Sequence, residues 1–378
     1  MKIVDIQWRN YRLPLIKGFS TAHGVMTTRE GIIVQVTSER GIVGIGEIAP
    51  LPAFGGGSLA DGSTLLQKLA ARLYGKTLHE ALDLLHTEGG AATKAASAVP
   101  GTATPALCGL EIALLDAIGK AEECGVSMLL SPSGSLPRAA VAVNAVVGAR
   151  TVETAVAAAQ DARRKGFRCV KLKVGWGVSV REEIERVAAV RHAIGPAMHL
   201  RLDANEAWKL EEASAILAQC VPYDIQYVEQ PLKARDLAGM RALRRAVPIP
   251  IAVDEALYSL ESANLVLDSE AADVLVIKPQ LAGGLRAAQQ IMQRAAQRGV
   301  RSVITSAIEA GIGLAAALHL AAASPAVTLE CGLATLHLLS DDLLIDDLPV
   351  RDGFLAVPKG AGLGVALDEE ALDRYAFI

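Results

Sequence analysis

The chain has 378 residues, which exceeds one average domain and allows a large hydrophobic core. Its 41 acidic and 37 basic residues give a net charge of −4 and a pI near 6.0, and no basic stripe is present, which argues against nucleic acid as a partner. Five cysteines without a CxxC pair indicate reduced thiols and a cytoplasmic setting.

No signal peptide or membrane insertion is predicted. The N-terminal run MKIVDIQWRNYRLPL has Asp5 and Arg9 where a signal peptide needs an unbroken apolar region. Residues 310–329 contain no Asp, Glu, Lys or Arg, but they are rich in alanine and are interrupted by His319 and Ser324-Pro325. We therefore expect a buried helix followed by a turn and a strand there.

The first 130 residues or so differ in pattern from the rest. Residues 2–15, 31–39 and 41–50 are typical of antiparallel strands, and residues 107–125 of a helix. The glycines in GIVGIG are in the wrong order for a dinucleotide-binding fingerprint and precede no helix, so we interpret Gly41, Gly44 and Gly46 as hairpin glycines.

From residue 138 the chain alternates short apolar runs with amphipathic helical segments. Eight strands with seven intervening helices imply parallel pairing through right-handed crossovers, and that number favours a closed barrel over an open sheet. The predicted strands are residues 139–147, 168–174, 198–204, 225–231, 250–255, 273–279, 301–306 and 327–331. After them, residues 343–367 return to a hairpin-like pattern.

Charged side chains stand within or at the ends of these strands. Lys171 and Lys173 are two apart on the second strand, so both project from one face. The third to sixth strands each end in a charged residue, and these residues are 26, 25 and 24 positions apart, about one βα unit. They are Asp203, Glu229, Asp254 and Lys278. Because barrel strands are covered on both faces, we expect these charges to meet in the barrel mouth, where such barrels carry their sites.

A cation and a neutral amine would explain this arrangement. Three converging carboxylates repel one another unless a cation lies between them, and all-oxygen ligands favour Mg²⁺. The crowding of Lys171 and Lys173 is expected to leave one amine neutral and able to take a proton. The predicted chemistry is proton abstraction next to a carboxylate, with the cation stabilising the enediolate. A solvated strand edge or a helix cap would explain single residues but not the whole set.

Several motifs resemble the enolase superfamily, in its muconate-lactonizing subgroup: VKLKVG, RLDANEAW, VEQPL, VDEAL and IKPQLAGG. GIVGIGEIAP and LEIALLDAIGKAEECG resemble the capping domain of that family, so the resemblance covers nearly the whole chain. It implies an α/β fold, a (β/α)7β TIM-like barrel with an α+β capping domain. The corresponding parts are residues 1–132 for the capping domain, 133–338 for the barrel and 339–378 for a C-terminal segment returning to the capping domain.

The resemblance also implies roles for the charged residues. Mg²⁺, with Mn²⁺ as a substitute, would be held by Asp203, Glu229 and Asp254. The acid/base lysines would be Lys173 and Lys278, with Lys171 as the neighbour that modulates them. The polar groups that support the ligands would be Asn205 and Glu255, although a cap or turn role stays open for Glu255.

Within the superfamily, o-succinylbenzoate synthases are the nearest resemblance. Ser306, Ile308, Glu309 and Gly313 resemble the serine, isoleucine-glutamate and glycine pattern of those enzymes, and TLECGLATLHLL resembles their eighth strand. The implied reaction is the dehydration of 2-succinyl-6-hydroxy-2,4-cyclohexadiene-1-carboxylate to 2-succinylbenzoate in menaquinone biosynthesis. The segment SAIEAGIG is also close to the form seen in racemases, so an N-succinylamino acid racemase or dipeptide epimerase stays open. A non-catalytic binding protein is a remote alternative.

A small-molecule carboxylate is the expected partner, and whether the chain forms a homo-oligomer stays open. The predicted substrate-binding residues are Arg201, Ser306, Glu309, Gly332, Phe54 and Ser20. Three of them have alternatives: Arg201 as a polar residue of a barrel layer, Ser306 as a helix cap and Phe54 as a surface aromatic.

Overall fold

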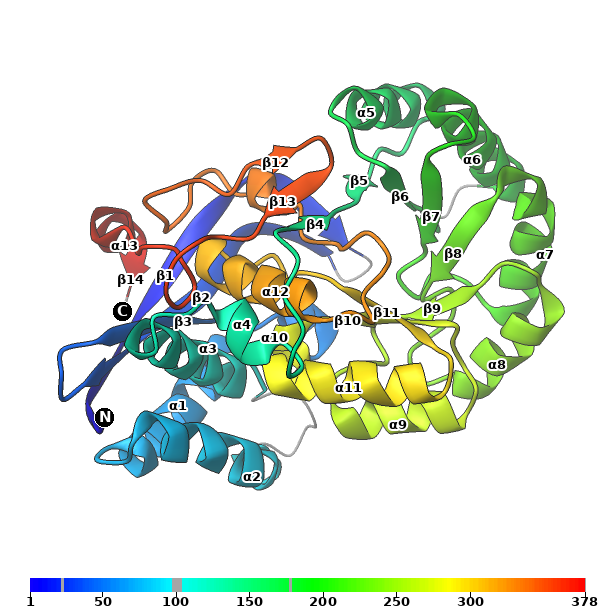
Figure 1. Cartoon of the computed structure of the whole chain (residues 1–378). Helices are drawn as coiled ribbons and strands as arrows, with labels where there is room; N and C mark the ends of the chain where they lie inside the picture. Colours follow the sequence, from blue (N-terminus) through cyan, green and yellow to red (C-terminus); the bar gives the residue numbers. More distant parts are fainter. Residues whose placement is uncertain (22–23, 97–103, 177–178, 378) are drawn as a thin grey trace.

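The computed structural model describes residues 1–21, 24–96, 104–176 and 179–377. Figure 1 shows two parts, a sheet with helices that forms a cap and a curled parallel sheet surrounded by helices. We call the first part the cap and define it as β1–β3 and β14 with α1–α3. The expected α/β barrel with a strand cap is therefore confirmed.

The cap sheet is antiparallel, in the order β14-β1-β2-β3. Its strands are β1 (Ile3–Thr21), β2 (Gly24–Ser38), β3 (Val43–Ile48) and the C-terminal β14 (Ala376–Phe377). The cap helices are α1 (Leu59–Leu73), α2 (Leu78–Ala96) and α3 (Thr104–Ala121). Because β14 pairs with β1 through Tyr11 and Asn10, the end of the chain returns to the cap as predicted.

The glycines of GIVGIG serve two purposes. Gly41 lies in the turn between β2 and β3 with a φ of +76°, as expected of a hairpin glycine. Gly44 and Gly46 instead lie within β3 under α3, where a Cβ atom would overlap the carbonyl oxygens of Ala113 and Gly109. The hairpin interpretation is therefore wrong for these two, which allow a helix to pack closely on the strand.

The barrel sheet contains seven parallel strands in the order β11-β10-β9-β8-β7-β6-β5. These are β5 (Ala145–Val147), β6 (Cys169–Lys173), β7 (His199–Asp203), β8 (Ile225–Glu229), β9 (Ile251–Val253), β10 (Val274–Ile277) and β11 (Arg301–Ile304). Helices α5–α9 surround the outside of the sheet (Figure 1), and their bounds are Val152–Arg164, Val180–Ile194, Leu210–Cys220, Leu237–Ala246 and Leu260–Asp268. Helices α10 (Pro279–Ala282), α11 (Leu285–Gln297) and α12 (Gly311–Ala323) complete this part.

The first and last predicted barrel strands are shorter than expected. Residues 139–147 divide into β4 (Ala140–Ala142), which pairs with the hairpin β12 (Val350–Arg351) and β13 (Phe354–Ala356), and β5 in the barrel. The predicted eighth strand is reduced to two parallel bridges, Val143 to Cys331 and Thr305 to Gly332. These bridges still join the two edges of the parallel sheet. The bounds predicted for the three parts of the chain stay a prediction.

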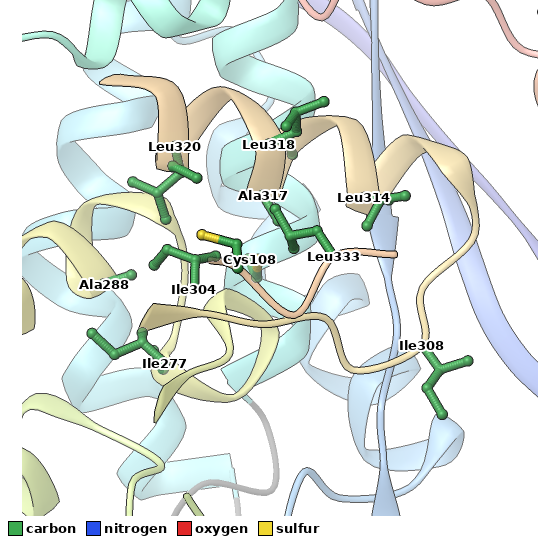
Figure 2. Close-up of a cluster of buried hydrophobic side chains, with 14 of the residues drawn as sticks. Cys108, Ile277, Ala288, Ile304, Ile308, Leu314, Ala317, Leu318, Leu320 and Leu333 are labelled. Atoms are coloured by element: carbon green, nitrogen blue, oxygen red, sulfur yellow. The ribbon is translucent and has the colours of Figure 1, made fainter. Parts of the chain in front are cut away.

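Helix α12 takes part in the apolar contact between barrel and cap, together with α10 and α11. All 13 of its residues are buried, as the interpretation of the charge-free stretch predicted. Figure 2 shows Ala317 and Leu318 of this helix in one cluster with Cys108 of α3 and Ile304 of β11. No helix in the described part of the chain is long and apolar enough to cross a membrane, and the five cysteines are free thiols.

Candidate active site

A cavity of about 260 Å³ opens at the carboxyl ends of the parallel strands. Lysine and aspartate side chains from β6, β7 and the residues after β9 and β10 line its polar part: Lys171, Lys173, Asp203, Asp254 and Lys278. Neutral side chains from the loop after β11 and the 331–338 segment form much of the rest, and Leu51 and Phe54 from the segment between β3 and α1 add to the wall. These charged side chains lie together at one end of the sheet, as their spacing predicts, and Glu229 contacts Lys171 there without lining the cavity.

The two lysines of β6 share one face and contact neighbouring carboxylates. Lys171 Nζ donates to Glu229 Oε1 at 2.8 Å and lies 3.1 Å from Asp203 Oδ2. Lys173 Nζ donates to the same Asp203 oxygen at 2.7 Å and to Asn205 Oδ1 at 2.6 Å. Burial alone would raise the pKa of Asp203, but the ammonium groups of Lys173 and Lys171 lower it well below its usual range.

Crowding by Lys173 does not lower the pKa of Lys171, the lysine expected to modulate its neighbour. Burial favours the neutral form, yet the carboxylates of Glu229 and Asp203 raise the pKa of Lys171 well above its ordinary value. The charge of the Lys171 ammonium group is therefore compensated by its acidic neighbours. The spacing of Asp203 and Glu229 in the sequence indicates metal ligands, but it does not show how closely their carboxylates approach the lysine.

Lys278 follows β10 and faces this cluster from across the sheet. Its ammonium group forms an ion pair with Asp254 and lies 5.0 Å from the ring centre of Phe54. Burial lowers the pKa of Lys278, but Asp254 and Glu255 more than offset this and raise it. Phe54 therefore lies in the cavity wall beside a charged lysine, which fits a shielding role better than that of a surface aromatic.

The acidic residues offer unused oxygen atoms. Glu229 Oε2 and Glu255 Oε2 are buried without a hydrogen-bond partner, although Asn205 Nδ2 donates to the other Glu255 oxygen at 2.9 Å. Burial and the neighbouring aspartates raise the pKa of Glu229 to about 7 and that of Glu255 to about 8. No three His, Cys, Asp or Glu side chains among the described residues are already arranged around a common point. The donor set is nevertheless all oxygen, and a divalent cation would satisfy the orphaned carboxylate oxygen of Glu229.

Arg201 is not a cavity residue. It shares a strand face with Asp203 but lies deeper, toward the start of β7, and is fully buried. Its guanidinium donates to Gln226 Oε1 at 2.6 Å, to Glu330 Oε2 at 2.9 Å and to the Glu330 carbonyl at 2.7 Å. The alternative interpretation, a polar residue within a barrel layer, is the one that the geometry fits. The prediction of a substrate contact failed because alternation fixes the face of a side chain but not its depth.

The loop after β11 holds the predicted serine and glutamate differently. Ser306 lines the cavity, and its hydroxyl donates to Glu309 Oε2 at 2.5 Å and accepts from the Ile308 amide at 2.7 Å. It does not cap α12, which begins after Ala310 without a side-chain cap. Glu309 is buried beneath the loop and does not line the cavity, so it supports the loop instead of contacting substrate.

Side chains of the cap hold this loop from behind. Ile308 lines the cavity with a φ of +61°, which is strained for a β-branched residue. Its carbonyl accepts from Arg29 Nε of β2 at 2.9 Å. The carboxylate of Glu47 in β3 accepts from the Ala310 amide at 2.8 Å and from the Gly313 amide at 2.7 Å. The cap thus fixes the backbone of a cavity loop as well as covering it.

The remaining predicted contacts have mixed outcomes. Gly332 lines the cavity next to Thr305, and the side chain of Ser20 lies outside the described residues. Sequence reasoning missed the neutral lining residues Asn144, Trp176 and Thr335. Of these three residues, only Trp176 could have been identified from the sequence, because it comes shortly after the strand with the two lysines in VKLKVGWG.

Family models match most of the chain. The model of the mandelate racemase / muconate lactonizing enzyme N-terminal domain matches residues 4–131, and the enolase C-terminal domain-like model matches residues 154–371. The chain belongs to the enolase superfamily. The resemblance inferred from the sequence motifs is therefore confirmed.

Relatives within the enolase superfamily differ in activity. The L-Ala-D/L-Glu epimerase of Bacillus subtilis (strain 168) is 32% identical over 97% of both chains. The o-succinylbenzoate synthase of Thermobifida fusca (strain YX) is 40% identical over 59% of this chain and 68% of its own. The dipeptide epimerase of Enterococcus faecalis V583, solved with Mg and the dipeptide L-Leu-L-Tyr, superposes with a TM-score of 0.87 at 28% identity, covering 97% of this chain and 100% of its own. This chain is thus an enolase superfamily enzyme.

Proposed function

We propose that the chain is an o-succinylbenzoate synthase that converts 2-succinyl-6-hydroxy-2,4-cyclohexadiene-1-carboxylate and releases water. The observation that carries this proposal is the distribution of charge in the cavity. Asp203 and Asp254 are the only acidic residues among the described lining, and both lie beside lysines. Away from them the wall is neutral, so it offers no acidic partner to a substrate ammonium group, as a dipeptide would need, and no acidic side chain repels the carboxylate of a succinyl tail. The product belongs to menaquinone biosynthesis.

Lys173 is the proposed base and acid. Its neutral form takes the proton from the carbon next to the ring carboxylate, and the electron pair forms the enediolate. The protonated Lys173 then gives that proton to the departing hydroxyl on the same face, so that the C–O bond breaks, water leaves and an aromatic ring forms. Asn205, 2.6 Å from Lys173 Nζ, orients the amine toward the substrate.

The other charged residues stabilise the developing negative charge. Asp203, Glu229 and Asp254 would hold Mg²⁺, with Mn²⁺ as a substitute, and Glu255 would support them. When bound, the ion supplies positive charge beside the substrate carboxylate. Lys171 adds a permanent positive charge, and Lys278 lies in the opposite wall as an electrostatic partner for the ring.

A racemase or epimerase is the second candidate, because the two lysines lie on β6 and after β10 of the parallel sheet and both line the cavity. Such an enzyme would use Lys173 and Lys278 on opposite faces of one carbon. The full-length similarity to an epimerase favours it as well. A dipeptide substrate is disfavoured by the position of Glu330. This carboxylate contacts Arg201 and His199 below the cavity, so its segment offers no acidic group to a substrate ammonium.

A substrate panel tests the proposal. The purified protein is given the cyclohexadiene acid, an N-succinylamino acid and L-Ala-L-Glu, each with Mg²⁺ and with EDTA. We expect Mg²⁺-dependent formation of the aromatic product, followed by ultraviolet absorbance, and at most slow racemisation of the second substrate. Racemisation or epimerisation without dehydration would refute the proposal, and turnover that is unchanged in EDTA would refute the metal site.

A further inference from the structure

Helix α6 carries a buried ion pair on the side that faces the end of β6. Glu183 and Arg186 are each 2% exposed and contact each other directly. Taking two charges out of water is costly, and further hydrogen bonds to both groups offset that cost. Here three further bonds go to main-chain atoms at the end of β6 and in the loops after β5 and β6, while Arg186 Nε is buried without a hydrogen-bond partner.

The bonds converge on the backbone that carries Lys173. Arg186 Nη2 donates to the Lys173 carbonyl at 2.7 Å, and Nη1 donates to the Ala149 carbonyl at 2.7 Å. Glu183 Oε2 accepts from the Gly175 amide at 2.9 Å. One side-chain pair therefore holds the loop after β5 and the loop after β6 together.

Lys173 needs this support because the neighbouring strand stops short of it. β5 ends at Val147, which pairs with Leu172, so no residue of β5 continues the ladder opposite Lys173. On the other side β7 still reaches this level, since the Val174 amide donates to the Asp203 carbonyl at 2.9 Å. The Arg186 guanidinium takes the place of the missing strand, and Trp176 Nε1 adds a weaker donor at 3.2 Å to the same carbonyl.

We propose that Glu183 and Arg186 are positioning residues that fix the backbone of Lys173 and so aim its amine. This inference rests on the proposed function, in which Lys173 moves the proton. The pair touches no substrate and does not line the cavity. It acts through the main chain, because a displaced Lys173 carbonyl turns the side chain away from Asp203 and Asn205. Proton transfer depends steeply on such alignment, and a displacement of about 1 Å can lower the rate by about 100-fold.

Arg186→Met and Glu183→Gln test the proposal, and the helix itself offers a matched control. Arg181 and Glu185 form an exposed pair on α6 with Nε and Oε1 2.8 Å apart, so Arg181→Met and Glu185→Gln remove the same chemical groups from the surface. For each variant we would measure kcat, KM, the melting temperature and the isotope effect on kcat with substrate deuterated at the α-carbon.

We expect the buried variants to lower kcat by about 10- to 100-fold, with KM changed less than about threefold and a larger isotope effect than in the native enzyme. The surface variants should match the native enzyme in every readout. A lower melting temperature with native kcat and isotope effect in the buried variants would overturn the proposal and leave only a stabilising role. Glu183→Gln decides the outcome if Arg186→Met does not fold.

Lys173→Arg separates this inference from the proposed function. If that variant still removes the α-proton, Lys173 is not the base and the proposed function fails. If Lys173→Arg is inactive while both buried-pair variants behave like the native enzyme, the proposed function stands and the positioning role is refuted.

Discussion

Replacing Glu47 by glutamine tests whether a buried carboxylate makes the joint between cap and barrel sensitive to pH. Glu47 is fully buried, and its oxygens accept from the Tyr11 hydroxyl and from the Ala310 and Gly313 amides. Burial raises the pKa of Glu47 from 4.5 to about 7; the three hydrogen bonds oppose the shift and nearby Glu309 adds to it. Glutamine has the same shape but no charge at any pH.

The sign of the pH dependence follows from the pKa of Glu47 in the folded and the unfolded protein. The unfolded carboxyl group ionises near pH 4.5 and the folded one near 7, so between these values the folded protein keeps a proton that the unfolded chain has lost. The contribution of Glu47 to the free energy of unfolding is therefore fully present below pH 4.5 and is lost as the pH rises through 7. At 1.36 kcal/mol for each pKa unit, the loss amounts to about 3 kcal/mol.

Urea unfolding of the native protein and of Glu47→Gln between pH 4.5 and 8 measures this loss. We expect the free energy of unfolding of the native protein to fall by about 3 kcal/mol relative to the variant across that range. Glu39→Gln, at an exposed carboxylate of the β2–β3 turn, is the matched control and should show no such trend, because that carboxylate is solvated in both states. A difference between native protein and Glu47→Gln that does not depend on pH would refute the reasoning.

Three further outcomes are expected. Lys278→Arg should keep part of the dehydration rate, because only a positive charge is needed at that position. Any racemisation of an N-succinylamino acid should vanish for both enantiomers in this variant. Equal loss of dehydration and racemisation would contradict this prediction. Burial lowers the pKa of His319 below its ordinary value of 6.5. The stabilisation by the neutral His319 is therefore present above pH 6.5 and is lost as the pH falls. His319→Gln should flatten the decline of the melting temperature between pH 7 and 5. Gly46→Ala should destabilise the protein by about 1–3 kcal/mol, because the new Cβ would overlap the Gly109 carbonyl oxygen. In Gly41→Ala the new Cβ meets no atom within 4 Å, so the only cost is the strain of the positive φ. The melting temperature should therefore fall less in Gly41→Ala than in Gly46→Ala.

The strand-end charges could be predicted because two simple regularities place them. Alternation places Lys171 and Lys173 on one face, and the spacing of about 25 residues places Asp203, Glu229 and Asp254 at the ends of successive strands. Parallel strands begin and end at common levels, so residues at equivalent positions meet without any knowledge of the loops.

Depth and local hydrogen bonding could not be predicted in the same way. Arg201 shares the face of Asp203 but lies a layer below it, and Glu309 turns under its own loop to bind the Ser306 hydroxyl. Neutral wall residues such as Asn144 and Thr335 carry no chemical signature in a sequence. The eighth strand was overestimated because a buried apolar run indicates burial, whereas pairing depends on neighbours that only the fold supplies.

The strained Ile308 has a consequence for recombining members of this superfamily. Its backbone conformation is held by Arg29, and the neighbouring helix start by Glu47, both from the first 50 residues of the chain. A chimera that joins this barrel to a cap without these two side chains would lose both anchors together, so the wall of the cavity would relax even where every barrel residue is retained. A transplant of substrate preference must therefore carry Arg29 and Glu47 along with the barrel.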